Sequence, residues 1–342
     1  MPKTAMKTDN IEAAAASVLG CPVLSVEPAA AGGNNRVYRI ATADGAFALK
    51  FYPAQADDRR DRLGQEYRAL EFLATHGVTG VPRPIARDPG LACAVHQWIE
   101  GAPVADPGKA DVDAMVAFAG RLAALAAEPG AGKLAPASAH CFSGRAVAGQ
   151  LDERLGRLRD IAVEPALERF LDDEFAPRLA PLLRRAGGIY EDAGLDFDAV
   201  LKPASLTLSP SDFGFHNALR TGDGSIAFVD FEYFGWDDPV KMVADALWHP
   251  GSAFTPALAG RFRTGAERIF WGRDGDAFLI RLRALYPLFG MIWCLIVLNE
   301  FLPEPWKRRK AAGNAGDPSR ARARQLAAAK RLLGRVVKAA DE

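Results

Sequence analysis

A change in hydrophobic periodicity near residue 100 constrains the fold of this chain more than any other feature. Residues 36–40 and 46–51 alternate apolar and polar side chains, which is typical of half-buried strands, and Thr-Ala-Asp-Gly at 42–45 predicts a tight turn between them. From residue 112 onward most segments repeat their apolar residues with helical period. The clearest are 112–125, 146–158 and 165–185. The sequence therefore predicts an α+β fold in which an antiparallel β region precedes a mainly helical one.

Further elements are predicted within the first hundred residues. An alanine-rich helix is expected to begin near Asp9 or Asn10, and residues 23–29 form a short extended run. Residues 58–75 have helical period, and Gly77 is expected to end that helix. One face of it is apolar and carries Leu63, Tyr67, Leu70 and Leu73. Val81-Pro-Arg-Pro84 predicts a rigid connector, and residues 91–99 predict either a strand pair or one long strand.

The charges of the chain balance, with 42 Lys and Arg against 42 Asp and Glu. A net charge of zero argues against a general polyanion binder and makes nucleic acid a poor candidate partner. The charges are nevertheless unevenly distributed along the chain, because residues 306–342 hold eleven basic and three acidic side chains. We expect this basic tail to serve in helical packing or in solvation, with its charges exposed on one face.

Cysteine usage and apolar segments bear on the compartment. The four cysteines lie far apart and form no CxxC pair, which predicts a reducing, cytoplasmic setting. The apolar run at residues 13–19 is shorter than a secretory signal and has acidic residues before it, so it fits an N-terminal helix better. Residues 284–298 are too few to span a bilayer and contain Pro287 and Gly290. They predict a buried core helix and no membrane partner.

The residues that carry chemistry are concentrated between positions 208 and 233. Asp212 and Asn217 are separated by four residues, and Asp230 follows the apolar strand predicted at 226–229. Phosphoryl transfer needs such a set, because one carboxylate must deprotonate an acceptor hydroxyl while an Asn and an Asp hold Mg²⁺ against nucleotide phosphates. Taken singly, Asp212 and Asn217 could be turn residues that bond their own backbone, and Asp230 could cap a turn.

Other parts of a phosphoryl-transfer site occur in a fitting order. Gly32, Gly33, Asn34 and Asn35 lie between two predicted strands, where a glycine-rich hairpin can bring backbone amides close to phosphate. Lys50 ends the next strand and can bind phosphates, and Glu66 on the following helix can pair with Lys50. Gln97, Trp98 and Ile99 lie where a hinge backbone can bind the adenine edge. A solvated Lys50–Glu66 pair would be worth less than about 1 kcal/mol, and Gly32-Gly33 could be a plain turn.

With these motifs together, the chain resembles the aminoglycoside phosphotransferase and choline kinase-like family of small-molecule kinases, which share the protein-kinase fold. The resemblance covers roughly residues 32–245 and implies a two-lobed structure that uses ATP and Mg²⁺. It implies a nucleotide-binding lobe at 1–98, with a small antiparallel sheet and one helix, and a helical catalytic lobe at 99–342. It assigns Asp212 as catalytic base, Asn217 and Asp230 as magnesium ligands, and Lys50, held by Glu66, to the phosphates.

The chain departs from the family pattern at three positions. Pro210 and Ser211 stand where the family usually has His-Gly, and Met242 replaces a second Asp, which puts the support of the catalytic loop in doubt. Asp212-Phe-Gly214 resembles the metal-binding triplet of protein kinases, but Asn217 downstream marks it as the catalytic loop; the triplet is Asp230-Phe-Glu232.

The five histidines have no metal-binding spacing, which argues against a zinc site, and His216 is expected to pack or orient the loop rather than act as a second base. Three acidic residues near the metal site could attract a cationic acceptor or could equally be a solvated loop: Glu232, Asp237 and Asp238.

Three functions remain open at this stage. The first is a phosphotransferase acting on a hydroxyl of a small molecule such as an amino alcohol, a sugar or an aminoglycoside. The second is a catalytically silent nucleotide-binding protein of the same fold, which the residues at 210, 211 and 242 favour. The third is a nucleic-acid binder that uses the basic tail, whose contacts would be salt-sensitive.

Overall fold

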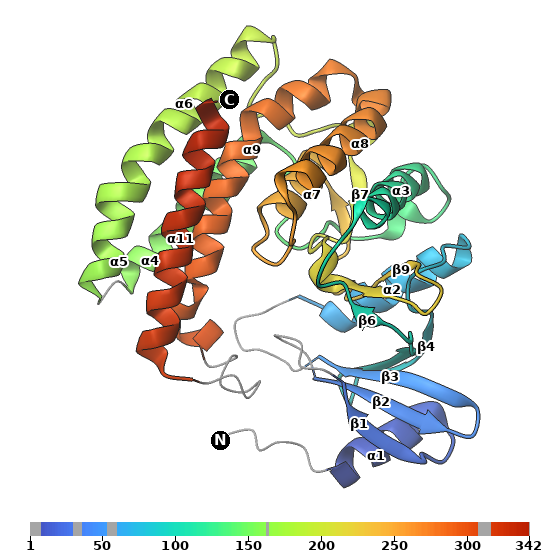
Figure 1. The fold of residues 1–342 in the computed structure, drawn as a ribbon. Helices are drawn as coiled ribbons and strands as arrows, with labels where there is room; N and C mark the ends of the chain where they lie inside the picture. Colours follow the sequence, from blue (N-terminus) through green and yellow to red (C-terminus); the bar gives the residue numbers. More distant parts are fainter. Residues whose placement is uncertain (1–7, 30–35, 53–59, 162–163, 307–315, 342) are drawn as a thin grey trace.

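The computed structural model describes residues 8–29, 36–52, 60–161, 164–306 and 316–341 (Figure 1). Its first part is a five-stranded antiparallel sheet with the strand order β1-β2-β3-β5-β4. The strands are β1 Ser25–Pro28, β2 Arg36–Thr42, β3 Gly45–Phe51, β4 Pro84–Asp88 and β5 Cys93–Gln97. The predicted β2–β3 hairpin is present, and its turn joins Thr42 to Gly45. Residues 91–99 contribute one strand, whereas β4 was not predicted because Pro84 pointed to a connector.

Two helices flank this sheet. The helix α1 (Thr8–Leu19) packs Ile11, Ala14 and Ala15 onto the sheet. The helix α2 (Arg62–Thr75) begins four residues later than predicted, because the Asp61 carboxylate accepts the backbone N–H of Gly64 and caps it. The predicted apolar face of α2 is buried, apart from the partly exposed Tyr67. Leu70 and Leu73 join the larger core of the second part, whereas Leu63 packs with Ala94 of β5, so α2 contacts both parts.

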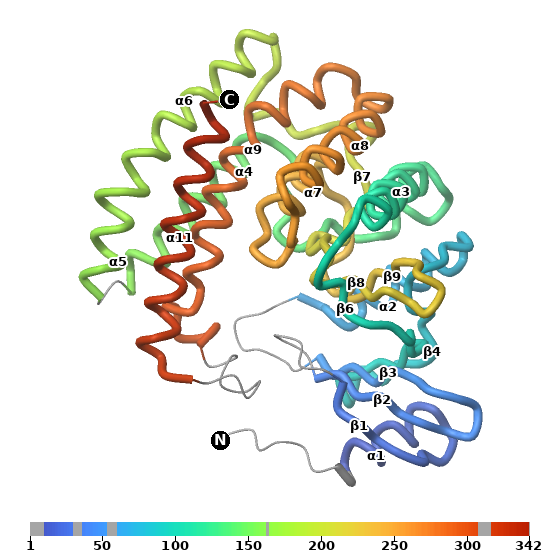
Figure 2. Tube along the Cα trace, viewed as in Figure 1, coloured from blue at the N-terminus to red at the C-terminus, as the bar shows by residue number. Residues whose placement is uncertain are grey.

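The second part is mainly helical. It contains the short strands β6 Ala102–Pro103, β7 Thr207–Ser209, β8 Ala218–Arg220, β9 Ile226–Phe228 and β10 Gly235–Asp237, which form the β6-β8-β9 and β10-β7 sheets. Its longer helices are α3 Lys109–Leu125, α4 Gly144–Asp160, α6 Ala176–Asp192, α7 Pro239–Trp248, α8 Pro256–Asp274, α9 Asp276–Val297 and α11 Pro318–Asp341. Shorter turns are α5 Pro165–Arg169, η1 Ala131–Lys133, η2 Phe170–Phe175, η3 Pro203–Ser205, η4 Phe215–Asn217 and η5 Leu298–Phe301. Figure 2 shows the β6-β8-β9 sheet between the five-stranded sheet and the helices α3 and α7.

The helix α9 is the centre of the helical part and contacts α4, α6, α7, α8 and α11. The segment Asp276–Phe301 is long and apolar enough to cross a membrane, but 67% of its most apolar window is buried inside the protein. Pro287 and Gly290 are among its buried residues. The prediction of a buried core helix at 284–298 is therefore confirmed.

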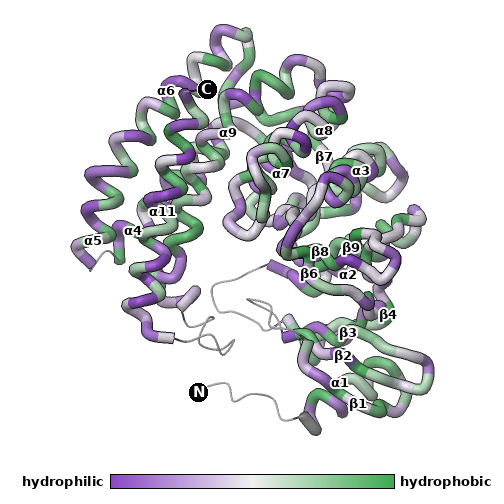
Figure 3. The backbone as a smooth tube through the Cα atoms, in the orientation of Figure 1, coloured by the Kyte–Doolittle hydropathy of each residue, from purple (hydrophilic) through white to green (hydrophobic). Residues whose placement is uncertain are grey.

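The described part of the basic tail forms α11, which packs against α9 and alternates hydrophobic and hydrophilic residues (Figure 3). Its cations pair with acidic residues of the same lobe: Arg322 lies 2.6 Å from Glu164, and Lys330 lies 2.5 Å from Glu174. Arg335 lies over the ring of Trp248. Part of the local positive charge is thus neutralised within the fold, as expected for a packed helix.

Candidate active site

Lys50, Glu66 and Asp230 form a buried ion cluster, although they come from three distant segments. Nζ of Lys50 in β3 lies 2.6 Å from Oε2 of Glu66 in α2 and 2.5 Å from Oδ1 of Asp230 after β9. The Lys50 and Glu66 side chains are 7% and 3% exposed, whereas Asp230 is 36% exposed. The cluster therefore has one side toward solvent, at Asp230.

Glu66 uses both carboxylate oxygens. Oε2 accepts the hydroxyl of Tyr52 at 2.7 Å in addition to Lys50, and Oε1 accepts the backbone N–H of Phe231 at 3.1 Å. In addition, Nε2 of His96 lies 3.2 Å from the Tyr52 hydroxyl. Glu66 therefore connects the lysine to the loop that carries Asp230.

The charges of the cluster shift its pKa values. Burial opposes the charged form of Lys50, but Asp230 and Glu66 outweigh it and raise the pKa of the ammonium group above its ordinary range. Burial would raise the pKa of Glu66, but Lys50 lowers it below its usual value. Burial raises the pKa of Asp230 to about 6, against the pull of Lys50. Lys50 is consequently a fixed positive charge at neutral pH.

The β8–β9 hairpin brings the backbone segments of the two predicted magnesium ligands, Asn217 and Asp230, next to each other. Asn217 immediately precedes β8, Asp230 follows β9 closely, and Ala218 pairs with Phe228 in the register. The backbone N–H of Val229 donates to the carbonyl of Asn217 at 2.9 Å. Asp230 has a φ of 67°. Such a left-handed backbone is uncommon for a non-glycine residue and typical of functional loops.

Hydroxyl groups support the loop that carries Asp212. Ser209 accepts the backbone N–H of Ser211 at 3.0 Å, and the Ser211 hydroxyl donates to the carbonyl of Ser138 at 3.0 Å. Ser211 has a φ of 66°. The position immediately before Asp212 is therefore held by side-chain and backbone contacts, although Ser211 departs from the family pattern.

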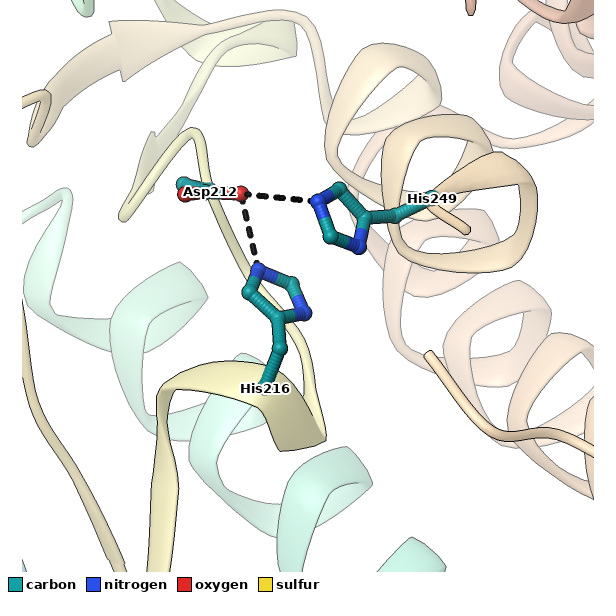
Figure 4. Close-up of side chains that lie close together, drawn as sticks. All are labelled: Asp212, His216 and His249. Atoms are coloured by element: carbon teal, nitrogen blue, oxygen red, sulfur yellow. Dashed lines mark hydrogen bonds and ion pairs between the residues drawn. The ribbon is translucent and has the colours of Figure 1, made fainter. Parts of the chain in front are cut away.

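Two histidines surround the Asp212 carboxylate, which is 32% exposed (Figure 4). Nε2 of His216 lies 2.8 Å from Oδ1, and Nε2 of His249, which follows α7, lies 3.8 Å from the same oxygen. Asn217 Nδ2 donates to the backbone carbonyl of Asp212 at 3.0 Å. Burial would raise the pKa of Asp212, but the hydrogen bond from His216 and the nearby His249 hold that pKa below its ordinary value. Asp212 is thus ionised at neutral pH.

The hinge residues lie at the end of β5, in the sheet that holds Lys50. Gln97 pairs with Phe47 in β3, and its backbone N–H donates to the carbonyl of Arg83 at 2.8 Å. Trp98 and Ile99 follow and are partly exposed, and the guanidinium of Arg39 lies 5.8 Å from the centre of the Trp98 ring. Gly32, Gly33, Asn34 and Asn35 lie outside the residues that the structure describes.

The expectation that three acidic residues form a solvated loop or face a cationic acceptor is wrong. Glu232, Asp237 and Asp238 are 1%, 0% and 2% exposed. Glu232 pairs with the buried Arg62 at 3.5 Å, and Asp238 pairs with the buried Arg281 at 3.2 Å. Buried carboxylates need such partners, because an unpaired charge in the interior is costly.

Asp237 accepts the backbone N–H groups of Cys141 and Asp238, both at 2.9 Å. Met242 is buried in the core of the helical part. Met242 therefore gives the loop that carries Asp212 no polar support from α7. His249, which follows that helix, lies 3.8 Å from the Asp212 carboxylate instead.

Sequence reasoning missed three contributors to the site: Tyr52, the backbone of Phe231, and His249. Phe231 lies inside the recognised triplet, but a backbone contact has no sequence signal. His249 lies 33 residues after His216, a spacing typical of no motif. Tyr52 lies two residues after Lys50, and only that proximity could have drawn attention to it.

Comparison with known proteins places this geometry in a family. The sequence profile of the phosphotransferase enzyme family matches residues 25–279. No curated protein sequence matches the chain significantly.

Several solved structures share the fold. Choline kinase LicA from Streptococcus pneumoniae is 18% identical, with 95% of this chain and 98% of that chain covered and a TM-score of 0.58. Spectinomycin phosphotransferase APH(9)-Ia, solved with ADP and spectinomycin, is 10% identical over 99% of both chains with a TM-score of 0.61. The gentamicin complex of APH(2")-IIa is 13% identical over 96% of both chains with a TM-score of 0.61. The match covers both the sheet and the helical part, which confirms the predicted kinase-like α+β fold.

Proposed function

The chain belongs to the phosphotransferase enzyme family, and we propose that it transfers the γ-phosphate of ATP to a hydroxyl of a small molecule in the cytoplasm. The observation that carries this proposal is the buried Lys50–Glu66–Asp230 cluster, beside a loop in which Asp212 is ionised. Phosphoryl transfer uses both of these features: a fixed cation that binds the phosphates and a carboxylate that accepts the hydroxyl proton.

We assign the nucleotide to the lobe formed by residues 1–98 and the acceptor to the lobe formed by 99–342. Lys50 binds phosphate oxygens, and Glu66 holds its direction through the 2.6 Å contact. The backbone of Gln97, Trp98 and Ile99 takes the adenine edge, and the segment from Gly32 to Asn35 covers the phosphates. Asp212 accepts the proton of the acceptor hydroxyl as the hydroxyl oxygen attacks the γ-phosphorus.

The donor set at Asn217 and Asp230 fits Mg²⁺. Nδ2 of Asn217 donates to the carbonyl of Asp212, which directs the amide so that its Oδ1 atom is the one able to bind a cation. Asp230 adds a carboxylate that is 36% exposed, and oxygen ligands of this kind suit magnesium. When held by these residues, the ion would offset the negative charge of the nucleotide phosphates.

The acceptor is expected to be an amino alcohol, a sugar or an aminoglycoside-like compound. Structures that share the fold include a choline kinase, a spectinomycin phosphotransferase, a gentamicin complex of APH(2")-IIa and an amicoumacin kinase, which supports a hydroxyl-bearing small molecule as acceptor. With Glu232, Asp237 and Asp238 buried, acidic residues at those positions do not argue for a cation in particular.

The test is consumption of ATP in the presence of Mg²⁺ against a panel of amino alcohols, sugars, aminoglycosides and nucleosides. We expect one class to stimulate ATP consumption and to appear as a phosphorylated product by mass spectrometry. Asp212→Asn should abolish that product while nucleotide binding, followed by thermal shift, stays nearly intact. Nucleotide binding with neither hydrolysis nor transfer for the wild type would instead identify a silent nucleotide-binding protein.

A further inference from the structure

We infer that His216 and His249 are positioning residues for Asp212, whose Oδ1 atom they hold so that Oδ2 receives the proton of the acceptor hydroxyl. This inference rests on the proposed function, because it concerns the geometry of the proposed base. Figure 4 shows both rings directed at the same carboxylate oxygen.

The tautomer of His216 follows from its contact with Asp212. Its Nε2 atom lies 2.8 Å from Oδ1, and an ionised carboxylate only accepts hydrogen bonds, so Nε2 carries the proton. Within the part of the chain that the structure describes, Nδ1 of His216 is buried without a hydrogen-bond partner. The ring therefore makes its hydrogen bond through Nε2–H, and the acceptor is Asp212.

The tautomer of His249 follows from the opposite side of its ring. The backbone N–H of Gly251 donates to Nδ1 at 2.9 Å, so the proton of the neutral ring is on Nε2. Burial, with His216 nearby, lowers the pKa of His249 to about 4, which keeps the ring neutral. The Nε2–H group faces Oδ1 at 3.8 Å, a distance that can shorten when substrate binds.

Packing fixes the two rings relative to each other. They stack with centroids 3.7 Å apart and an angle of 17° between their planes. The rings of His249 and Trp293 in α9 lie nearly perpendicular, at 86°, with centroids 4.7 Å apart, and the Trp293 indole N–H donates to Asp245 in α7 at 2.8 Å. The pair of donors is thus anchored to two helices of the catalytic lobe.

Two glycines provide the space for these rings. A Cβ atom on Gly214 would lie 2.6 Å from Cε1 and 2.7 Å from Nδ1 of His216, and one on Gly251 would lie 3.0 Å from Cε1 of His249. The φ of Gly214 is 174°, an extended value that any residue adopts, so backbone conformation does not require glycine there. The requirement is steric, and it is set by the histidine.

The same three side chains meet a distance criterion for a metal ion, since their ligand atoms lie within 4.8 Å of one another. The geometry favours hydrogen bonding instead. Nε2 of His216 lies 2.8 Å from Oδ1, which is the length of a direct hydrogen bond to a carboxylate. The Gly251 hydrogen bond also places a proton on the His249 nitrogen that would have to bind the metal.

Holding Oδ1 has a chemical consequence for Asp212. The terminal torsion of an aspartate is broad, so a carboxylate is not oriented by its own rotamer. The hydrogen bond from His216, with the Nε2–H group of His249 3.8 Å away, holds Oδ1 and leaves the second oxygen for the acceptor hydroxyl. Misplacement of a reacting group by about 1 Å can cost roughly 100-fold in rate.

The test compares variants that keep or remove the Nε2 donor. His216→Gln and His249→Gln retain an N–H near that position, whereas His216→Phe and His249→Phe keep the ring shape without it. We expect the Phe variants to lower kcat about 10- to 100-fold, with a twofold change or less in the KM for ATP and in nucleotide affinity. The Gln variants should recover part of the loss. The reaction measured is phosphoryl transfer from MgATP to the acceptor identified with the panel. If no acceptor in the panel stimulates ATP consumption, hydrolysis of MgATP is measured instead.

Gly214→Ala displaces the His216 ring without deleting any functional group, so it should lower kcat like His216→Phe. Its matched control is Gly222→Ala in the exposed β8–β9 turn, where a Cβ atom meets nothing within 4 Å. Nitrogen NMR of the wild type should show a proton on Nε2 of both His216 and His249.

Unchanged kcat in both Phe variants, or tight binding of Zn²⁺ that His249→Phe abolishes, would overturn the inference while the phosphotransferase stands. A wild type that turns over no MgATP would overturn the proposed function and this inference together.

Discussion

The Oε1 atom of Glu66 accepts the backbone N–H of Phe231 at 3.1 Å, across 165 residues of sequence. The other oxygen of the same carboxylate holds Lys50 at 2.6 Å. One side chain on α2 therefore sets both the lysine on the sheet and the loop that carries Asp230. We expect a substitution of Glu66 to weaken both its contact with Lys50 and its hydrogen bond to the loop that carries Asp230.

Replacing Glu66 with glutamine tests this coupling. The change keeps the size of the side chain but removes the charge that pairs with Lys50, and hydrogen bonds to charged groups are worth about 1.5–3 kcal/mol. We expect the affinity for ADP to fall roughly tenfold or more, which isothermal titration calorimetry would measure. Glu71→Gln on the exposed side of the same helix is the control and should leave the affinity unchanged. Equal affinities in the two variants would remove Glu66 from the nucleotide site.

Asp230→Asn should separate nucleotide binding from the magnesium effect. The wild type is expected to gain thermal stability from ADP and a further increment when Mg²⁺ is added, because a ligand that binds only the folded state stabilises it. The variant should lose mainly the magnesium increment, since an amide is a weaker ligand than a carboxylate. Asp223→Asn, an exposed carboxylate in the turn of the β8–β9 hairpin, provides the comparison. A full magnesium increment in Asp230→Asn contradicts the assignment.

Asp237 should make folding stability depend on pH. Burial raises the pKa of Asp237 to about 7, whereas an unfolded aspartate has a pKa of about 3.9. Between these values the folded state keeps a proton that the unfolded state has lost, so raising the pH favours unfolding, by roughly 1.4 kcal/mol per pH unit at most. Burial opposes the charge on Lys241, but Asp245 and Asp237 outweigh it, and that ammonium group stays charged throughout.

The measurement is urea unfolding at pH 5 and pH 8. Asp237→Asn imitates the protonated form, so its stability relative to the wild type should increase from the lower to the higher pH. The asparagine oxygen can still accept the N–H groups of Cys141 and Asp238, and Asp245 remains as a partner for Lys241. Parallel stabilities at both pH values would show that Asp237 is ionised throughout the window.

The buried Arg281–Asp238 pair should matter far more than an exposed pair of the same chemistry. Nε and Nη2 of Arg281 in α9 each lie 3.2 Å from a carboxylate oxygen of Asp238, at the start of α7. Arg281→Met leaves that carboxylate buried without its cation and should destabilise the protein by about 3–5 kcal/mol. The matched control is Arg261→Met, which breaks an exposed two-contact pair with Asp113 and should leave the unfolding midpoint nearly unchanged. Similar midpoint shifts for both variants would count against a structural role for the buried pair.

Much of the fold was predictable because its signals are local. The alternation in β2 and β3, the turn between them and the apolar face of α2 follow from neighbouring residues alone. The strand β4 was missed because Pro84 is its first residue, a position where proline needs no ladder donor. The burial of Asp238 was missed for a different reason, since its partner Arg281 is recognised only once α7 and α9 are packed.

The sequence by itself determined which residue types are available for phosphoryl transfer and their order along the chain, because motif spacing within one loop or hairpin is a property of the local backbone. Tertiary structure decided how those residues are oriented. Phe231 meets Glu66 only because α2 lies against the loop after β9, and His249 meets Asp212 only because the end of α7 lies beside the loop after β7. Hydrogen bonds and ring stacking depend on distances of a few ångströms between segments far apart in sequence, and only the packed core sets those distances.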